Sequence, residues 1–437
     1  MSNTLCSFAF AHTDIEPNGD IKFCCAVRAG ANRDPNGNVY NVTTHTLKEA
    51  WNSEILKQTR MEMIQGKRPE VCDYCWKLET SDNTQGTSVR LQAAEKRIPI
   101  SSISDRIEYA KSHNGELKDL AFDFQLSIGN LCNLACKMCS PGFSTQYQKF
   151  FSKFHNSPQE INFVKIPPLN DGVHFEFPFG TNFDWPVTQS LTEIFKDHIP
   201  TLKRIFFTGG EPTLIPQVLE FIDHLSVDAP EDFTVWPSTN CTNINKRMLE
   251  SLSQFNEIWL NLSLDGMDDI AYIQRTPSKW ENIEKNVDQL MNWARDQETI
   301  GKKIQIVVIT TITSLNFHHV LDFWEYLENR YGNITHYGIS ANVVLPEKTN
   351  LGIEAVPVGV IKELRNKCIQ LLEKSNESTC VVLKQYLHLL DTVNFAQDSE
   401  QIHFCLEQVQ KYHPELDIKK IYNVYYPDQL TTDSTTV

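Results

Sequence analysis

Between residues 119 and 345 the chain alternates strand-length apolar runs with helical patterns, and this rhythm restricts the fold more than any other feature. Two parallel strands need a crossover connection that a helix supplies, so the alternation predicts an α/β fold with a parallel sheet. The predicted strands cover 120–128, 204–210, 233–240, 257–266, 303–313 and 334–344, and helical patterns lie between them. Six such units predict a partial (β/α)6 TIM-like barrel, because a complete eight-unit barrel needs about 250 residues.

The segments on either side of this barrel have a different character. Residues 1–90 are rich in turns and predict a small α+β module with a hairpin between PNGD (17–20) and DPNGN (34–38). In the same module, 46–66 is predicted as one helix with Thr46 as its N-cap. A charged connector covers 91–118, and a C-terminal helical extension with a polar tail covers 346–437.

One stretch inside the barrel, residues 157–190, lacks clear periodicity and is rich in Pro, Gly and aromatic residues. A long irregular insertion of this kind is typical of a functional loop or lid. We therefore expect 157–190 to lie beside the functional site.

Charge and apolar pattern exclude several classes of function. The formal net charge is −15, which argues against a general nucleic-acid partner, because phosphate backbones attract a basic face. No secretion signal and no run of 18 apolar residues is present, so we expect a cytoplasmic protein without a membrane partner. In a reducing compartment, clustered cysteines among the 12 present indicate metal binding or catalysis rather than disulfides.

The first cysteine cluster follows the first predicted barrel strand. Cys132, Cys136 and Cys139 form C-x3-C-x2-C, a spacing that lets one tight loop aim three thiolates at one point. Three thiolates can hold a [4Fe–4S] cluster and leave its fourth iron open to a substrate or cofactor. A zinc site with a distant fourth ligand, or an accidental spacing, would produce the same pattern.

The stretch FQLSIGNLCNLACKMC (124–139) resembles the signature of the radical S-adenosylmethionine (radical SAM) enzymes. The aromatic residue that usually precedes the last cysteine of that signature is replaced here by Met138. The resemblance implies a [4Fe–4S] cluster held by Cys132, Cys136, Cys139 and exchangeable SAM. Reductive cleavage of SAM would then yield a 5′-deoxyadenosyl radical that abstracts hydrogen from a substrate.

Further motifs fall where the same family contacts SAM. TGGEP (208–212) follows the second predicted strand and resembles the segment that holds the SAM amino group through backbone carbonyls. SLDG (263–266) ends the fourth strand, and Arg275 matches the basic contact to the SAM carboxylate. The cofactor-binding residues that the resemblance implies are Gly209, Gly210, Glu211, Pro212, Asn240, Ser263, Asp265 and Arg275. Polar residues at strand ends are also ordinary turn formers, so location favours these assignments more than residue type.

The second cysteine group lies in the N-terminal module. Cys72 and Cys75 form C-x2-C after the predicted helix, and Cys6 and Cys24 complete a set of four. The order of Cys6, Gly19, Cys24, Trp51 and the closing pair resembles the SPASM/Twitch module, which implies a second, auxiliary [4Fe–4S] cluster. That module usually follows the barrel, whereas here it precedes it.

Two points about this second group stay open from the sequence. Cys25 adjoins Cys24, and the spacing from Gly19 favours Cys24 as the ligand. A four-thiolate zinc ribbon would use the same residues, because tetrahedral zinc accepts four cysteines equally well.

The resemblance to SPASM/Twitch enzymes also implies a class of substrate. It favours a peptide or protein, with a small molecule or carbohydrate as the alternative, and an electron donor such as flavodoxin or ferredoxin as partner. A non-catalytic iron–sulfur or zinc protein is a further alternative, although a carrier would not need GGEP and SLDG. Cys241 ends the third strand and is either a hydrogen donor inside the barrel or, as we favour, a packing residue.

Overall fold

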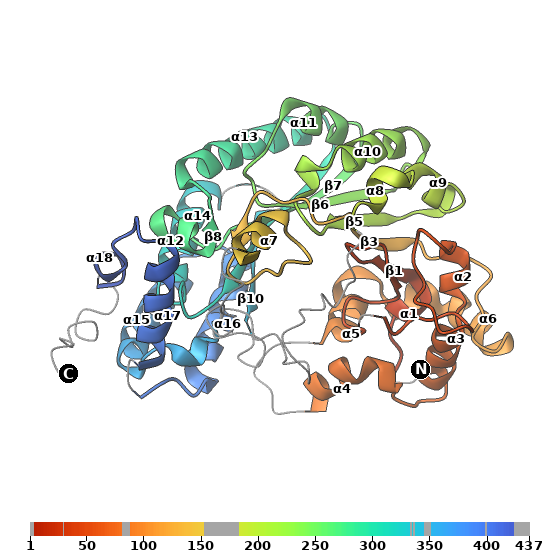
Figure 1. The fold of residues 1–437 in the computed structure, drawn as a ribbon, viewed down its shortest axis with the longest axis horizontal. Coiled ribbons are helices and arrows are strands. Elements are labelled where there is room, and N and C mark those ends of the chain that lie inside the picture. The colour runs from red at the N-terminus through yellow and green to blue at the C-terminus, as the bar shows by residue number, and fades with distance from the viewer. Residues whose placement is uncertain are drawn as a thin grey trace.

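The curved parallel sheet at the centre of the molecule carries the other elements (Figure 1). The computed structural model describes residues 4–28, 30–80, 88–152, 183–332, 334, 337–344, 351–397 and 400–423. The strands of the sheet lie in the order β10-β9-β7-β6-β5-β3-β1-β2. Except for the antiparallel pair β1–β2, neighbouring strands run parallel.

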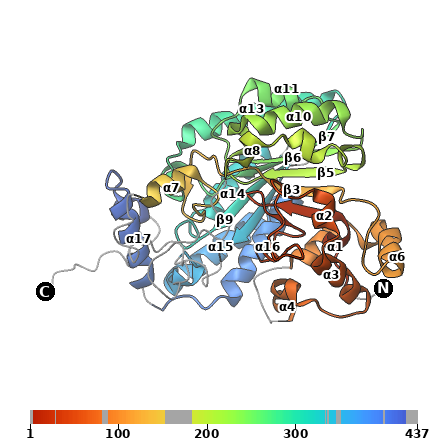
Figure 2. The ribbon, with the colours of Figure 1, turned by 45° about the vertical axis from the view of Figure 1, so that its right-hand side comes forward.

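Six of these strands correspond to the six predicted from the sequence. They are β3 (Asp123–Ser127), β5 (Arg204–Thr208), β6 (Thr234–Thr239), β7 (Glu257–Ser263), β9 (Lys303–Ile312) and β10 (Tyr337–Val343). Helices connect them: α10 (Pro216–Asp228), α11 (Lys246–Leu252), α13 (Trp280–Thr299) and α14 (Val320–Tyr331). Figures 1 and 2 show α10, α11 and α13 along one side of the sheet. The predicted partial barrel is therefore confirmed.

The N-terminal hairpin extends this sheet instead of standing apart from it. Strand β1 (His12–Ile15) pairs in parallel with β3, from His12 opposite Asp123 to Ile15 opposite Leu126. Strand β2 (Ile21–Lys22) then pairs antiparallel with β1. An edge strand leaves a row of backbone groups unpaired, and β1 supplies partners for the edge of β3.

The helices of the N-terminal module differ from the prediction in one respect. The expected single helix over 46–66 is two helices, α2 (Leu47–Trp51) and α3 (Glu54–Ile64). Thr46 caps α2, as predicted, and forms a capping box with Glu49, while Ser53 caps α3 by accepting from the N–H of Leu56. Because a second N-cap residue interrupts the periodic stretch, the chain starts a new helix there.

The remaining helices of this part surround the hairpin. They are α1 (Phe8–Ala11), α4 (Asp73–Thr80), α5 (Val89–Gln92) and, in the predicted connector, α6 (Ser104–Ser112). Figure 2 shows α1, α2, α3 and α4 grouped beside β3, away from α10, α11 and α13.

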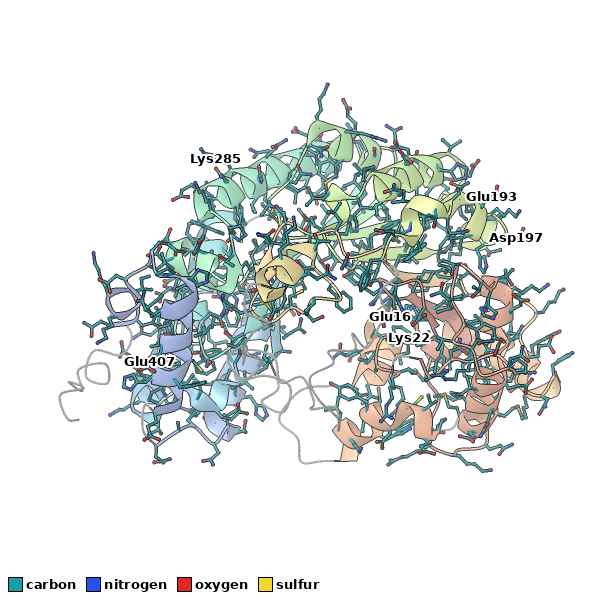
Figure 3. The ribbon with its side chains drawn as sticks, in the orientation of Figure 1. Glu16, Lys22, Glu193, Asp197, Lys285 and Glu407 are labelled. Carbon is teal, nitrogen blue, oxygen red and sulfur yellow. The ribbon has the colours of Figure 1, made fainter. Side chains whose placement is uncertain are left out.

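Buried ion pairs hold this module against the barrel. Asp123 at the start of β3 is fully buried and contacts His12 Nδ1 at 2.6 Å and Arg97 Nη2 at 2.9 Å. Burial alone would raise the pKa of Asp123, but Arg97, His12 and Arg204 together lower it to about 2. On the hairpin, the side chains of Glu16 and Lys22 lie together and form a second buried pair (Figure 3).

The C-terminal part is helical, as the sequence predicted. It contains α15 (Ile361–Leu372), α16 (Glu377–Thr392), α17 (Glu400–Tyr412) and α18 (Ile418–Asn423). Helix α16 packs against β10 and α15, whereas α17 and α18 join α12 in a smaller apolar cluster.

Several short elements lie near the carboxyl ends of the strands. They are β4 (Ala135–Cys136), α7 (Thr145–Ser152), α8 (Trp185–Thr188), α12 (Asp268–Gln274) and β8 (Arg275–Thr276), whereas α9 (Leu191–Phe195) packs against α10. Most of the predicted insertion 157–190 lies outside the described residues, as does the polar tail from 424 onward. None of the described helices is long and apolar enough to cross a membrane. The predicted domain boundaries stay predictions.

Candidate active site

The C-x3-C-x2-C loop leaves β3 at its carboxyl end and folds back on itself. Thr145 Oγ1 donates to the carbonyl of Cys132 at 3.0 Å, and the N–H of Cys139 donates to the carbonyl of Cys136 at 3.0 Å. Cys136 is buried, Cys132 and Cys139 are half-buried, and all three line the same cavity. The structure therefore brings together the three cysteines that the sequence singled out.

A two-stranded ladder fixes Cys136 against Arg275. Strand β4 pairs antiparallel with β8, and Cys136 lies opposite Arg275 in the register. Arg275 Nη1 donates to Cys136 Sγ at 3.7 Å, while its Nε donates to Asp265 Oδ2 at 2.6 Å. Asp265 is buried and also accepts from the N–H of Thr311 at 2.7 Å. Asp265 thus contributes to the site by holding Arg275 in place, and it does not itself line the cavity.

The electrostatics of the loop fit a polynuclear metal cluster. Burial raises the pKa of the Cys139 thiol to about 12 and also raises that of Cys136, with mutual repulsion among the three thiolates adding to both shifts. Arg275 opposes these shifts. Thiols of this kind ionise when a metal takes the protons' place, so binding is coupled to proton release. Soft thiolates grouped beside one fixed cation are a donor set that suits iron–sulfur binding.

The two glycines of TGGEP let this segment lie directly on the cysteine loop. A Cβ on Gly210 would lie 2.2 Å from the carbonyl oxygen of Leu131, and one on Gly209 would lie 2.9 Å from Cα of Ser127. Gly209 also has a φ of +104°, which side chains other than glycine rarely adopt. The N–H of Glu211 donates to the same Leu131 carbonyl at 2.7 Å. Both glycines line the cavity through their backbone.

The carboxylate of Glu211 is committed to protein partners. It accepts from Thr213 Oγ1 at 2.7 Å, from Thr239 Oγ1 at 2.8 Å and from the N–H of Asn240 at 2.7 Å. Glu211 is 1% exposed, so this carboxylate ties the ends of β5 and β6 together. Pro212 is also buried, in the short 3-10 turn Pro212–Leu214, and does not line the cavity. The Glu211 carboxylate borders the cavity but is satisfied by protein partners, and the two glycines present backbone.

The remaining predicted contacts lie at neighbouring strand ends. Asn240 Nδ2 lies 3.9 Å from Cys132 Sγ and donates to Asn133 Oδ1 at 3.1 Å. Ser263 lines the cavity next to Ser238, with 3.4 Å between their hydroxyl oxygens. Cys241 is fully buried and does not line the cavity, which favours the packing role.

The cavity itself has a volume of about 990 Å³ and is built from three parts of the chain. Besides the strand ends, Tyr74 and Leu78 of α4 and residues of α16 line it. The N-terminal contribution also includes Val89, Gln92 and Glu95, and the C-terminal one includes Gln385, Tyr386, His388 and Leu389. Sequence reasoning missed all of these, because no local motif marks a side chain that reaches the site across domains.

The four N-terminal cysteines line a second, smaller pocket. Cys6 precedes β1 and Cys24 follows β2, whereas Cys72 ends the 3-10 turn Glu70–Cys72 and Cys75 lies in the first turn of α4, yet all four line this pocket. Burial raises the pKa of Cys6 to about 11 and raises that of Cys72, and the charges of the other cysteines add to both. Cys25 is exposed and does not line this pocket.

The spacing of these cysteines bears on the kind of metal centre. A tetrahedral zinc ion with Zn–S bonds of about 2.3 Å draws its sulfurs to within about 4 Å of one another. Within the described ranges, no group of three or more His, Cys, Asp or Glu side chains is gathered closely enough to hold a single metal ion. The four thiols nevertheless line one pocket, and four cysteine ligands suit both a [4Fe–4S] cluster and a tetrahedral zinc ion.

The placement of Cys24 and Cys25 predicts different outcomes for their substitution. Cys24→Ser is expected to remove the N-terminal metal centre, whereas Cys25→Ser is expected to leave it intact, because only Cys24 lines the pocket. Iron, zinc and acid-labile sulfide per chain after anaerobic purification measure this directly. Equal metal loss in both variants would contradict the assignment.

A second prediction concerns the buried pair Asp265–Arg275, whose side chains are 0% and 12% exposed. Asp265→Asn is expected to destabilise the apo protein by about 3 kcal/mol, because it leaves a buried guanidinium without its counter-ion. It is also expected to weaken SAM binding at least tenfold, since Arg275 is no longer held. Denaturant unfolding and equilibrium dialysis with SAM measure the two effects.

The matched control is Asp288→Asn, which breaks the partly exposed pair with Arg330. Exposed pairs contribute about 1 kcal/mol or less, so this variant should unfold nearly like wild type and bind SAM normally. Equal losses in the two variants would refute a special role for Asp265.

Two family models match this chain. The radical SAM superfamily model matches residues 126–324, and the SPASM iron–sulfur cluster-binding domain model matches residues 6–76. No curated protein matches the chain. Solved structures that resemble it include SuiB of Streptococcus suis bound to S-adenosylmethionine, at 15% identity over 89% of this chain and 74% of that one, with a TM-score of 0.34.

A second similar structure is anSMEcpe with bound AdoMet, at 16% identity and a TM-score of 0.35. The match covers 57% of this chain and 60% of that protein, which is less than two thirds of its length. The two domain matches are the ones that the cysteine motifs predicted, with the SPASM domain at the N-terminus. The chain therefore combines a radical SAM domain with an N-terminal SPASM domain, which makes it a radical SAM enzyme whose two domains imply [4Fe–4S] clusters and S-adenosylmethionine as cofactors.

Proposed function

We propose that this radical SAM enzyme modifies a peptide or protein, and that substrate and SAM meet in the cavity at the carboxyl ends of the strands. Cys132, Cys136 and Cys139 hold the catalytic cluster, and Cys6, Cys24, Cys72 and Cys75 hold the auxiliary one. An external one-electron donor, such as flavodoxin or ferredoxin, reduces the enzyme. When bound, the catalytic cluster and SAM supply a 5′-deoxyadenosyl radical that removes a hydrogen atom from the substrate.

The residues of the chain bind and orient SAM. Arg275, held by Asp265, offers its guanidinium to the SAM carboxylate, a charge-assisted contact whose geometry suits arginine. Backbone carbonyls along residues 208–210, which line the cavity, would accept from the SAM amino group. Asn240 and Ser263 add polar contacts at the ends of β6 and β7, while Glu211 and Pro212 hold the turn in place.

The lining of the cavity is the observation that carries the choice of substrate. Within the described residues, the Asp, Glu, Lys and Arg side chains among the cavity-lining residues are Glu95, Glu211 and Arg275, and His388 is the one histidine there. Glu211 is buried, and Arg275 is paired with Asp265 and assigned to the SAM carboxylate, so these side chains leave no further cation for a phosphate. Amide, hydroxyl and apolar groups make up the rest, which suits an uncharged, amide-rich substrate.

The last strand of the sheet adds a second argument for a peptide. The N–H of Val344 donates to Ile312 on β9, so in this parallel pairing Ala341 and Val343 direct their N–H and C=O groups away from β9. Strand β10 ends the sheet, and both residues line the cavity. Backbone groups at this two-residue spacing match those of an extended peptide, as in β-strand addition.

Fractionation of a host-cell extract tests the proposal. The anaerobically reconstituted enzyme, with SAM and dithionite, is expected to form more 5′-deoxyadenosine with the peptide fraction than with the small-molecule fraction. Protease treatment of the peptide fraction should abolish the stimulation. Stimulation that survives protease, or that follows the small-molecule fraction, would instead favour a metabolite or carbohydrate substrate.

A further inference from the structure

We propose that the C-terminal helices α17 and α18 are part of the cluster site, and that His413 positions Lys137 behind the cysteine loop so that its charge supports reduction of the cluster. The inference rests on the proposed cluster ligands Cys132, Cys136 and Cys139, but not on the class of substrate. It assigns a role to the C-terminal extension, for which the sequence offered no motif.

The central contact joins two residues that lie 276 positions apart. Lys137 lies between Cys136 and Cys139 and is 2% exposed, and its Nζ lies 3.0 Å from His413 Nε2. An ammonium can only donate, so His413 Nε2 accepts and its Nδ1 carries the proton. Burial and the nearby Lys137 lower the pKa of His413 to about 4, which keeps the ring a neutral acceptor.

A second contact ties the same C-terminal segment to the other side of the β4–β8 ladder. Tyr272, on α12, donates from its hydroxyl to Glu415 Oε1 at 2.9 Å, and its ring centroid lies 5.3 Å from that of His413. Helix α12 leads directly into Arg275, and the N–H of Lys137 donates to the carbonyl of Gln274. The extension therefore braces both strands of the ladder that holds Cys136 and Arg275.

Apolar packing anchors α17 and α18 at this place. A core cluster separate from the main one joins them to α12 and to the segment after β9. Its members include Ile270, Ile273, Leu315, Ile402, Leu406, Val409, Ile418 and Tyr422. The hydroxyl of Tyr422 donates to the carbonyl of Leu315 at 2.8 Å. Figure 1 shows α17 and α18 beside α12, at the end of the molecule opposite the N-terminal module.

The charge of Lys137 explains why this brace matters to the cluster. Reduction adds one negative charge to the cluster, and a buried cation nearby stabilises that charge because the interior screens it weakly. Lys137 supplies such a cation from behind the loop, and His413 determines where it lies. Loss of either residue is expected to make the cluster harder to reduce.

A redox titration of the reconstituted full-length enzyme, followed by EPR, tests this inference. At a fixed potential, Lys137→Met is expected to lower the ratio of reduced to oxidised catalytic cluster at least tenfold. For one electron, a tenfold change corresponds to a shift of about 59 mV in the midpoint potential. His413→Ala is expected to shift the ratio in the same direction. The double variant should show no larger shift than Lys137→Met alone, because the two residues act through one contact.

Two controls accompany these variants. Glu407→Gln changes an exposed carboxylate on α17 and should titrate like wild type; Figure 3 shows where Glu407 lies on that helix. The auxiliary cluster serves as an internal reference, since iron retained in the N-terminal module shows that a variant is folded. If His413→Ala loses iron from both sites, His413→Gln takes its place in the test, because its side chain keeps a hydrogen-bond acceptor. His413→Gln is expected to lower the ratio of reduced to oxidised catalytic cluster by about threefold.

Wild-type potentials in Lys137→Met and in the folded His413 variant would overturn the inference while leaving the proposed function intact. Wild-type enzyme that holds no iron dependent on Cys132, Cys136 and Cys139 would overturn both. The two failures are therefore distinguishable in one set of samples.

Discussion

Replacing Cys132, Cys136 and Cys139 together by alanine is expected to lower the iron content from about eight to about four per chain. The three thiols line the active-site cavity, whereas the four N-terminal cysteines line a separate pocket on the other domain. One centre should therefore be lost without the other. Formation of 5′-deoxyadenosine from SAM should fall below detection, because the remaining iron has no route to SAM. Iron, sulfide and nucleoside analysis on anaerobic samples measures these effects.

Cys380→Ala is the matched control for this triple variant, since Cys380 is a half-buried cysteine on α16 and lines neither pocket. It should keep about eight irons and full SAM cleavage. About four irons in wild type, none in the triple variant and one zinc in both would identify the N-terminal centre as a zinc ribbon. Unchanged iron in the triple variant would refute the ligand assignment itself.

Gly210→Ala is expected to weaken SAM binding at least tenfold and to destabilise the apo protein by about 2 kcal/mol. The added methyl group would lie 2.2 Å from the carbonyl oxygen of Leu131 and 2.9 Å from the carbonyl carbon of Asn130. Both atoms are backbone, so the TGGEP segment and the cysteine loop have to move apart. Equilibrium dialysis with SAM and denaturant unfolding report the two effects separately.

The control for this steric effect is Gly301→Ala. Gly301 has a φ of +87° and no atom within 4 Å of an added Cβ. Gly301→Ala should therefore destabilise the apo protein by about 1 kcal/mol, through backbone conformation alone. SAM affinity should be that of wild type. If Gly210→Ala binds SAM as tightly as Gly301→Ala does, the close approach of the two loops does not matter for the site.

The strands and the cysteine loop were predictable because their signals are local. Strand β3 and the loop after it are contiguous in sequence, and the apolar runs that became β5, β6 and β7 have strand length and clear boundaries. The N-cap role of Thr46 was predictable for the same reason. The break at Ser53 was missed because a second capping residue inside a periodic stretch also fits an uninterrupted helix.

Other features depended on contacts between residues far apart in the chain. The pairing of β1 with β3 joins segments about a hundred residues apart. The sequence pattern of a hairpin predicts its two strands but not which strand of a sheet they will pair with. The role of Glu211 could not be read from TGGEP, because its three partners lie on two different strand ends. The motif predicted a carboxylate free to bind a ligand, whereas in the structure this carboxylate links the ends of β5 and β6 through hydrogen bonds.

The sequence by itself determined the class of chemistry, because ligand spacing and strand-to-loop order are properties of short segments. Only the tertiary structure decided how the site is closed and held. It placed Arg275 against Cys136 through β4 and β8, and it put Tyr74 and residues of α16 into the cavity wall. It also brought His413 to Lys137. Each of these contacts forms because burying apolar helices and pairing strand edges brings distant segments together, and no local pattern encodes the partner.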